Sequence, residues 1–249
     1  MSKLSVVIIT LNEEENIERC IASVKLIADE IIVLDSFSSD NTVRLARQSG
    51  ANVFQEKFEG YTLQKQRVVS MSQHDVVLSI DADEVLSEKL QKSILAEKQN
   101  GFAADAYEMN RLNFLGERAI KTCGLYPDTK IRIWNKFKGG WQGGKVHEQM
   151  TMMDNSVIKK LNGDLLHYTY KNTEQLSLQM KKFALLAAQD LKQENVFFLF
   201  SKMTFSPAFK FFRTYFFKLG LADGNTGLTI CFYQSWGVFL KYFYALKNK

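Results

Sequence analysis

The sequence predicts an α/β protein, with a mostly parallel sheet covered by helices on both faces and a helical, aromatic and basic C-terminal extension. Three observations lead to this prediction. Apolar, β-branched segments alternate strictly with helical segments over roughly the first 100 residues, which is typical of a parallel sheet. Polar side chains follow these apolar segments, as they do where ligands bind such sheets. Residues 181–249 hold 10 Lys or Arg against 3 Asp or Glu, so the basic character of the chain is a C-terminal property.

Four apolar segments are expected to form the parallel strands. A continuous β-branched run is typical of a strand that is buried on both faces. In chain order, the strands are Leu4–Leu11, EIIVLDS, ANVFQ and DVVLSIDAD. Because parallel strands end at one edge of their sheet, the polar residues that follow the first, second and fourth strands should gather there.

A helix is expected after each strand. Asn12 would cap the first helix, EEENIERCIASV, whose acidic first turn suits the helix dipole. Ser39 or Asp40 would cap NTVRLARQSG, and Gly50 would end it. The third helix is YTLQKQRVVSMS, and the fourth is SEKLQKSILAEKQ, which opens at Ser87.

The pattern changes at about residue 101. Short β-like runs, DAYEMNRLNFL, KIRIWN and LLHYTY, are separated by glycine-rich turns such as KGGWQGGKVHE. They predict a mixed, partly antiparallel extension of the sheet that completes the site. Beyond them, TEQLSLQMKKFALLAAQDLKQ has a helical period. We therefore predict a main domain over residues 1–170 and a helical extension over residues 171–249.

Several common classes of protein do not fit the sequence. Cys20, Cys123 and Cys231 are odd in number, far apart and outside any CxxC pair, which argues against a disulfide framework or a cysteine-bound zinc. The first glycine is Gly50, too late for a dinucleotide-binding fingerprint, and no GxxxxGK[ST] phosphate loop occurs. The start, MSKLSVVIITLNEEEN, resembles neither a signal peptide nor a transmembrane helix, so a cytoplasmic location is expected.

Three carboxylates follow the fourth strand in the stretch LSIDADEVL, namely Asp81, Asp83 and Glu84. Like charges at this spacing persist mainly where a cation or a proton relieves them. A hard divalent cation, Mn²⁺ or Mg²⁺, takes such oxygen ligands. One of Asp81 and Asp83 would hold the metal, and the other would orient a sugar hydroxyl or a ligand water. Two alternatives are a solvated acidic turn and the DxDx[TV] site of haloacid-dehalogenase-like phosphatases, although the later aspartates are all isolated.

These motifs in their order resemble the nucleotide-binding half of glycosyltransferase family 2, which has the GT-A fold. The resemblance is carried by SVVIITLNEEENIERCIASV, DEIIVLDSFSSDNTVRLARQSGANVF and VVLSIDADEVL. Four later segments, KVHEQM, LLHYTY, SPAFKFFRTYFFKLGLADGNTG and FLKYFYALK, resemble the branch related to lipopolysaccharide-core β-1,4-glucosyltransferases. The resemblance implies a Rossmann-like GT-A sheet and an inverting, metal-dependent transfer of a hexose from a UDP-sugar. The saccharide acceptor would belong to lipopolysaccharide or another cell-surface glycan.

The resemblance also implies roles for residues of the donor site. Thr10, Asn12 and Glu13 would line the nucleoside pocket, and Asp35 would accept a hydrogen bond from the uracil ring or the ribose. Capping of a loop is the structural alternative for Asp35. Lys65, in QKQRV, would steady the base or the diphosphate, unless it is a solvated surface lysine.

The acceptor side needs a general base that takes the proton of the attacking hydroxyl. The resemblance points to Glu148 in GGKVHEQM, and the adjacent His147 is the alternative. The metal would be held by Asp83, with help from Asp81 and from His167, although a histidine in an apolar strand also suits a core position. A non-catalytic sugar-nucleotide binding protein is the competing hypothesis.

Phenylalanines of the C-terminal extension recur at helical spacing. They are Phe205, Phe209, Phe212 and Phe216. Such a stripe suits either a core or an interfacial helix that is attracted to anionic lipid. With a lipid-linked or core saccharide as the acceptor, we expect peripheral attachment to the inner face of the cytoplasmic membrane. No nucleic-acid binding is expected, because no recognised module occurs and the cations form no dense run.

Overall fold

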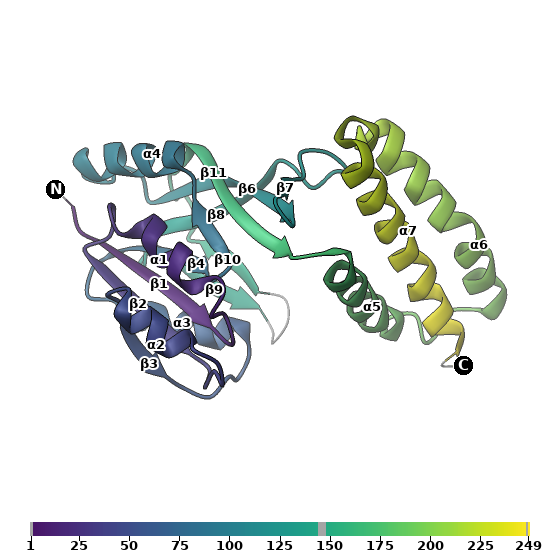
Figure 1. Cartoon of the computed structure of the whole chain (residues 1–249), viewed down its shortest axis with the longest axis horizontal. Helices are drawn as coiled ribbons and strands as arrows, with labels where there is room; N and C mark the ends of the chain where they lie inside the picture. Colours follow the sequence, from purple (N-terminus) through teal and green to yellow (C-terminus); the bar gives the residue numbers. More distant parts are fainter. Residues whose placement is uncertain (1, 144–147, 248) are drawn as a thin grey trace. The chain divides into compact units, whose positions relative to one another are not determined.

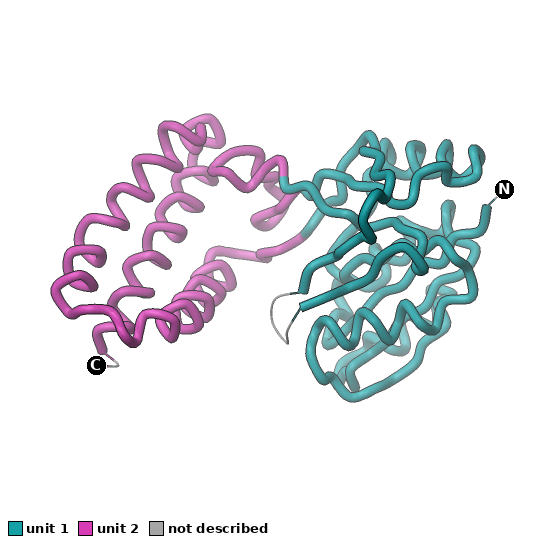
Figure 2. Tube along the Cα trace, turned by 180° about the vertical axis from the view of Figure 1, so that it is seen from behind, with its two compact units in different colours: residues 1–111, 128–167 teal, residues 112–127, 168–249 magenta. Residues whose placement is uncertain are grey.

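A computed structural model describes residues 2–143, 148–247 and 249 of the chain (Figure 1). The chain forms two compact units, which Figure 2 colours separately. The first consists of residues 1–111 and 128–167, and the second of residues 112–127 and 168–249. The structure thus groups the segment 112–127 with the C-terminal helices. The predicted domains, residues 1–170 and 171–249, stay a prediction.

Strands and helices alternate in the first unit in the order that the sequence predicts. The elements that begin in it are β1 (Leu4–Thr10), α1 (Ile17–Val24), β2 (Glu30–Asp35), α2 (Thr42–Gln48), β3 (Asn52–Gln55), α3 (Tyr61–Ser70), β4 (Val76–Asp81), β5 (Glu84–Leu86), α4 (Glu88–Gln99), β6 (Ala106–Leu115), β8 (Asp128–Asn135), β9 (Gly139–Gly143), β10 (Glu148–Met152) and β11 (Ile158–Tyr170).

The main sheet has the strand order β3-β2-β1-β4-β8-β6-β11-β5, and β7 (Arg118–Ala119) pairs with β6. β1 pairs in parallel with β2 and β4, and β2 with β3. Beyond β4 the pairs of β8 with β4 and β6, and of β5 with β11, are antiparallel. The predicted α/β class with a mixed extension is therefore confirmed. The register sets Thr10 opposite Asp35 and Ile9 opposite Asp81, so these strand ends share one edge.

Helices cover both faces of the parallel strands because successive side chains of a strand point to opposite faces. On one face, Val6 and Ile8 are buried in a core that includes Ile21 of α1, Ala46 of α2 and Ile94 of α4. On the other face, Val7 packs with Ile32, Leu34, Val68 and Val77, so α3 provides the cover there. The continuous apolar runs are thus strands with two buried faces.

Two predicted helix starts have different outcomes. Ser87 caps α4 as expected, with its hydroxyl accepting a hydrogen bond from the N–H of Leu90 at 3.3 Å. The prediction that Asn12 caps the first helix is wrong, because α1 begins only at Ile17. Asn12 has a φ of 55° and turns the chain instead, with its side-chain oxygen accepting the N–H of Ser39 at 2.9 Å.

The second unit is mainly helical, which confirms the predicted extension. Its elements are α5 (Thr173–Gln189), α6 (Val196–Phe212), the π-helix Arg213–Phe217, a short 3₁₀ helix (Gly220–Asp223) and α7 (Gly224–Lys247). A core formed by Ile120, Cys123, Leu176, Ile230 and Cys231 joins the segment 112–127 to α5 and α7.

The phenylalanine stripe of the second unit is not part of its core. Phe205, Phe209, Phe212 and Phe216 are between 51% and 73% exposed. Of the two roles considered for the stripe, core packing is therefore wrong. None of the helices that the structure describes combines the length and the apolar character of a membrane span.

Candidate active site

A cavity of about 340 Å³ lies where the parallel strands of the first unit end. The predicted site residues among its lining are Thr10, Glu13, Asp81, Asp83 and His167. Hydrophobic and aromatic side chains, among them Ile9, Phe58 and Tyr61, complete it, as is usual for a small-molecule site. The hydroxyl of Thr10 is buried and finds no hydrogen-bond partner within the described part of the chain. Buried polar atoms are seldom left unpaired, so this hydroxyl is available for a hydrogen bond to a bound molecule.

Two buried cations hold Asp81. The Nζ atom of Lys65 lies 2.9 Å from Oδ1, and Nη2 of Arg132 lies 3.2 Å from Oδ2. Lys65 is 2% exposed and Arg132 is 4% exposed. Burial of Asp81 opposes its ionisation, but the charges of Lys65 and Arg132 outweigh burial and hold the pKa of Asp81 well below its usual range. Asp81 is thus a stable anion whose two oxygens are both engaged.

Glu84 is fully buried beside this pair. Its Oε1 lies 2.5 Å from Arg132 and 3.6 Å from Arg111, and its Oε2 accepts the N–H of Asp81 at 3.0 Å. Burial by itself would lower the pKa of Arg132. The negative charges of Glu84 and then Asp81 outweigh burial, so the pKa of Arg132 is raised above its ordinary value. The crowding of carboxylates after β4 is therefore relieved in part by arginines of this chain.

Sequence reasoning missed both arginines. Arg132 lies on β8 and Arg111 on β6, in the antiparallel extension. The local signal was a charged side chain within the apolar alternation of KIRIWN, because a buried arginine requires a carboxylate partner. The sequence could not tell which carboxylate would be opposite it.

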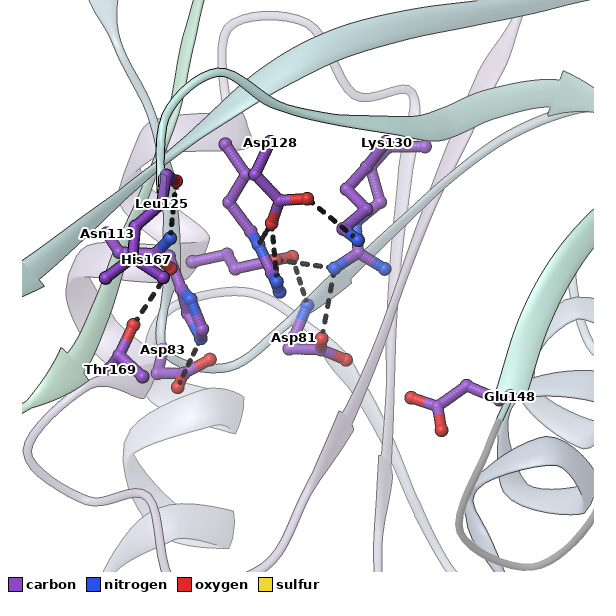
Figure 3. A network of polar contacts seen from close by, with 12 residues as sticks. Asp81, Asp83, Asn113, Leu125, Asp128, Lys130, Glu148, His167 and Thr169 are labelled. Carbon is purple, nitrogen blue, oxygen red and sulfur yellow. Dashed lines mark hydrogen bonds and ion pairs between the residues drawn. The ribbon is translucent and has the colours of Figure 1, made fainter. Parts of the chain in front are cut away.

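Asp83 and His167 form the second polar pair of the cavity. Oδ2 of Asp83 lies 3.1 Å from Nε2 of His167, and both side chains point toward each other in Figure 3. A carboxylate and an imidazole are both ligands of divalent metals. Within residues 2–143, 148–247 and 249, no group of three or more His, Cys, Asp or Glu side chains is arranged to hold a metal. Two protein ligands nevertheless fit a cation that takes its other ligands from phosphate and water.

Glu148 stands at the start of β10 and is joined to this site through Lys65. Its Oε1 lies 3.3 Å from Nζ of Lys65, the same atom that pairs with Asp81. The ammonium group also lies over the ring of Trp141, 4.4 Å from its centroid. Figure 3 shows the carboxylate of Glu148 directed toward the side on which Asp81 lies. The alternative base, His147, lies outside the described residues.

Asp35 and Asn12 organise the loop that follows β2. Asp35 is fully buried and accepts hydrogen bonds from the N–H of Ser38 at 2.9 Å and from Nε2 of Gln55 at 3.0 Å. The N–H of Asn12 donates to the hydroxyl of Ser38 at 2.8 Å. Both residues therefore shape the rim beside Thr10 and Glu13, and their contact with a nucleoside stays a prediction.

Comparisons with known proteins identify the relatives of this chain. The family model described as glycosyl transferase family 2 matches residues 5–159. An uncharacterized glycosyltransferase of Rickettsia typhi is 34% identical over 238 residues, 91% of this chain and 81% of the relative. The lipopolysaccharide core biosynthesis glycosyltransferase LpsC of Rhizobium meliloti is 26% identical over an alignment of 259 positions, which covers 99% of this chain and 94% of LpsC. Among solved structures, glucosyl-3-phosphoglycerate synthase of Mycobacterium tuberculosis, crystallised with Mn²⁺ and UDP, is 28% identical over 43% of each chain, with a TM-score of 0.38.

Proposed function

The chain belongs to glycosyl transferase family 2 and is a glycosyltransferase, and we propose that it moves a hexose from a UDP-sugar to a saccharide acceptor with inversion. One observation supports this proposal above the others. The 340 Å³ cavity at the end of the parallel strands brings together Thr10, Glu13, Asp81, Asp83 and His167, which come from segments far apart in the sequence. Such an edge is where α/β sheets bind nucleotides.

In this proposal, Mn²⁺ or Mg²⁺ would be held by Asp83 and His167, and by the diphosphate of the donor. The cation would neutralise the charge that develops on the departing diphosphate. Asp81 contributes differently, because Lys65 and Arg132 engage both of its oxygens. Its role is to fix Lys65 and the loop before Asp83, and to accept a hydrogen bond from a donor hydroxyl.

Glu148 is proposed as the general base. An inverting transfer requires a general base that takes the proton of the acceptor hydroxyl while that oxygen attacks the sugar carbon. Lys65 bridges Glu148 and Asp81, so one buried ammonium positions both the base and the donor side of the site. Correct placement of reacting groups contributes a large part of such a rate. His147 is the other candidate for the base.

The acceptor is proposed to be a lipid-linked or core saccharide of a cell-surface glycan, by similarity to LpsC. The enzyme would then work in the cytoplasm at the inner face of the cytoplasmic membrane. The exposed phenylalanine stripe and the excess of cations after residue 181 support this location, since apolar side chains and cations together bind anionic bilayers.

Release of UDP from a panel of UDP-sugars with Mn²⁺ tests the donor proposal. We expect slow hydrolysis by the natural chain and a loss of at least about 100-fold in Asp83→Ala, with UDP still bound in calorimetry. The control is Asp154→Ala, which removes an exposed carboxylate of the same unit and should leave the rate unchanged. Binding of a UDP-sugar without any release would instead identify a sugar-nucleotide binding protein without turnover.

Glu148→Gln tests the base. The amide keeps the size of the side chain but cannot take a proton, so transfer to an acceptor should fall by about 100-fold or more while UDP binding persists. Transfer at the natural rate would remove Glu148 from the mechanism and leave His147 as the candidate.

A further inference from the structure

A second cavity, of about 410 Å³, lies within the second unit and takes no part in the donor site. Its walls come from α5, from the end of α6 with the π-helix that follows, from α7, and from the turn Cys123–Leu125. Every one of these elements belongs to the same compact unit. The cavity has the size of a small-molecule site.

Four cations line this cavity, and no carboxylate does among the residues that the structure describes. They are Lys210, Arg213, Lys218 and Lys241. None of the four forms an ion pair with a carboxylate in the described ranges. Burial, followed by the charges of Arg213 and Lys218, lowers the pKa of Lys210. The cavity therefore holds four positive charges that form no ion pair with a carboxylate of the described residues.

Three of these cations, Lys210, Arg213 and Lys218, lie close together in the chain, at the end of α6 and at the two ends of the helical turn that follows it. Residues Arg213–Phe217 form a π-helix, a conformation that is rare and frequently marks functional sites. The Lys218 side chain that follows crosses Gly124, where a Cβ atom would lie 2.7 Å from its Cδ. Gly124 also has a φ of 71°, so a side chain would be strained there as well as obstructive. A side chain at position 124 would therefore meet the Lys218 side chain, which would have to move away from its observed position.

The rest of the cavity is apolar, with one polar exception. Met180, Phe183 and Val238 are among its apolar lining. The side-chain oxygen of Gln234 is buried there and has no hydrogen-bond partner in the part of the chain that the structure describes. An amide that can turn toward a ligand supplies either a donor or an acceptor.

The cations alternate with exposed aromatic rings along the chain. Phe209, Phe212 and Phe217 each directly precede a cavity cation and are 68%, 56% and 86% exposed. Cations beside exposed rings are typical of surfaces that meet lipid, since the charge reaches head groups while the rings enter the acyl region. A soluble phosphate compound would gain nothing from these rings.

We propose that this cavity binds the phosphate group of a phosphorylated lipid, a phosphomonoester or diphosphate carried on an apolar chain. The guanidinium and ammonium groups would contact the phosphate oxygens, and the exposed rings would contact the chain. This inference concerns binding in the second unit alone, so it stands or falls independently of the donor chemistry proposed for the first.

The test is co-sedimentation of the full chain with vesicles of phosphatidylcholine that contain either phosphatidic acid or phosphatidylserine, matched in total negative charge. The variant is Arg213→Gln with Lys241→Gln. The control, Lys192→Gln with Lys247→Gln, removes two exposed charges of the same unit outside the cavity. We expect tighter binding to phosphatidic acid, a loss of at least about tenfold in the cavity variant, and less than about twofold in the control.

Three results would overturn the proposal. Equal weakening by both double variants would mean diffuse attraction to an anionic surface, without a defined site. Equal binding of the two lipids would exclude recognition of a terminal phosphate group, which phosphatidic acid has and phosphatidylserine lacks. Thermal stabilisation by inorganic phosphate or pyrophosphate alone, without binding to phosphatidic acid vesicles, would assign the cavity to a soluble phosphate. If the double variant does not fold by circular dichroism, Lys218→Gln at the exposed rim is tested in its place.

Discussion

Replacement of Arg132 by methionine should strongly destabilise the first unit. Arg132 is 4% exposed, and its Nη2 atom lies 2.5 Å from Glu84 and 3.2 Å from Asp81. Methionine preserves much of the volume but removes the charge. Among the described residues, Glu84, which is fully buried, would then keep as partners Arg111 at 3.6 Å and the N–H of Asp81.

The magnitude follows from leaving a charge buried with too few partners. Removal of one member of a buried ion pair costs about 3–5 kcal/mol, against a typical total of about 5–15 kcal/mol for a folded protein. Lys130→Met is the matched control, because Lys130 lies two residues earlier on β8 and pairs with Asp128 at 2.9 Å with its own side chain 40% exposed. Such an exposed pair contributes only about 0–1 kcal/mol.

Urea unfolding, followed by fluorescence of the buried tryptophans, measures both variants. We expect the midpoint of Arg132→Met to fall far more than that of Lys130→Met. The double variant Arg132→Met with Glu84→Met should recover much of the loss, since an apolar pair often replaces a buried ion pair without cost. Equal losses from the two single variants would refute the view that Arg132 balances the buried carboxylates.

The pH dependence of this difference can be derived from Asp81. Because the pKa of Asp81 is held well below its usual range by Lys65 and Arg132, its contribution to stability is present above the unfolded-state pKa of about 3.9. That contribution is lost as the pH falls through the lower folded-state pKa. The gap between the natural chain and Arg132→Met should therefore be fully open at pH 6–7 and should narrow below about pH 4.

Three further predictions concern single substitutions. Lys65→Met should lower kcat/KM for transfer by about 100-fold, because Asp81 and Glu148 lose the ammonium group that they share. An unchanged kcat/KM in steady-state kinetics would contradict this prediction. Asp29→Asn should cost only about 1 kcal/mol at pH 7: burial opposes the shift, but hydrogen bonds from Lys98, the N–H of Leu4 and Lys3 lower the pKa of Asp29 to about 2, and solvent screens this exposed site. Urea unfolding should show that this cost disappears as the pH falls from about 4 to about 2. Gly163→Ala should cost about 1–3 kcal/mol in the same assay, because Gly163 has a φ of 106°; an unchanged midpoint would show that the chain adjusts there.

The arrangement of the parallel strands followed from local pattern. Runs such as Leu4–Thr10 contain almost only apolar residues, and the strands that they predict are the ones observed. The polar ends Thr10, Asp81 and Asp83 were expected at one edge, and they line one cavity. These features were predictable because side-chain period and strand-end position are encoded within a few neighbouring residues.

The environment of the carboxylates was not predictable in this way. The sequence indicated that Asp81, Asp83 and Glu84 need positive charge, and a divalent metal was the expected source. In the structure, Arg132 engages Asp81 and Glu84 from an antiparallel strand. The order of β8 and β6 beside β4 decides this contact, and no short stretch of sequence specifies that order.

Local pattern thus sufficed for the four parallel strands, the presence of the helices between them, the strand-end carboxylates and the basic, aromatic character of the C-terminal segment. Tertiary structure alone decided which cation meets which carboxylate. It also decided that Lys65 joins Asp81 to Glu148, although Glu148 follows Lys65 by 83 residues. It also collected around one cavity four cations of the second unit that form no ion pair with the carboxylates that the structure describes. The physical reason is that periodicity acts over single turns and strands, whereas charge pairing depends on distances between segments that only the complete packing sets.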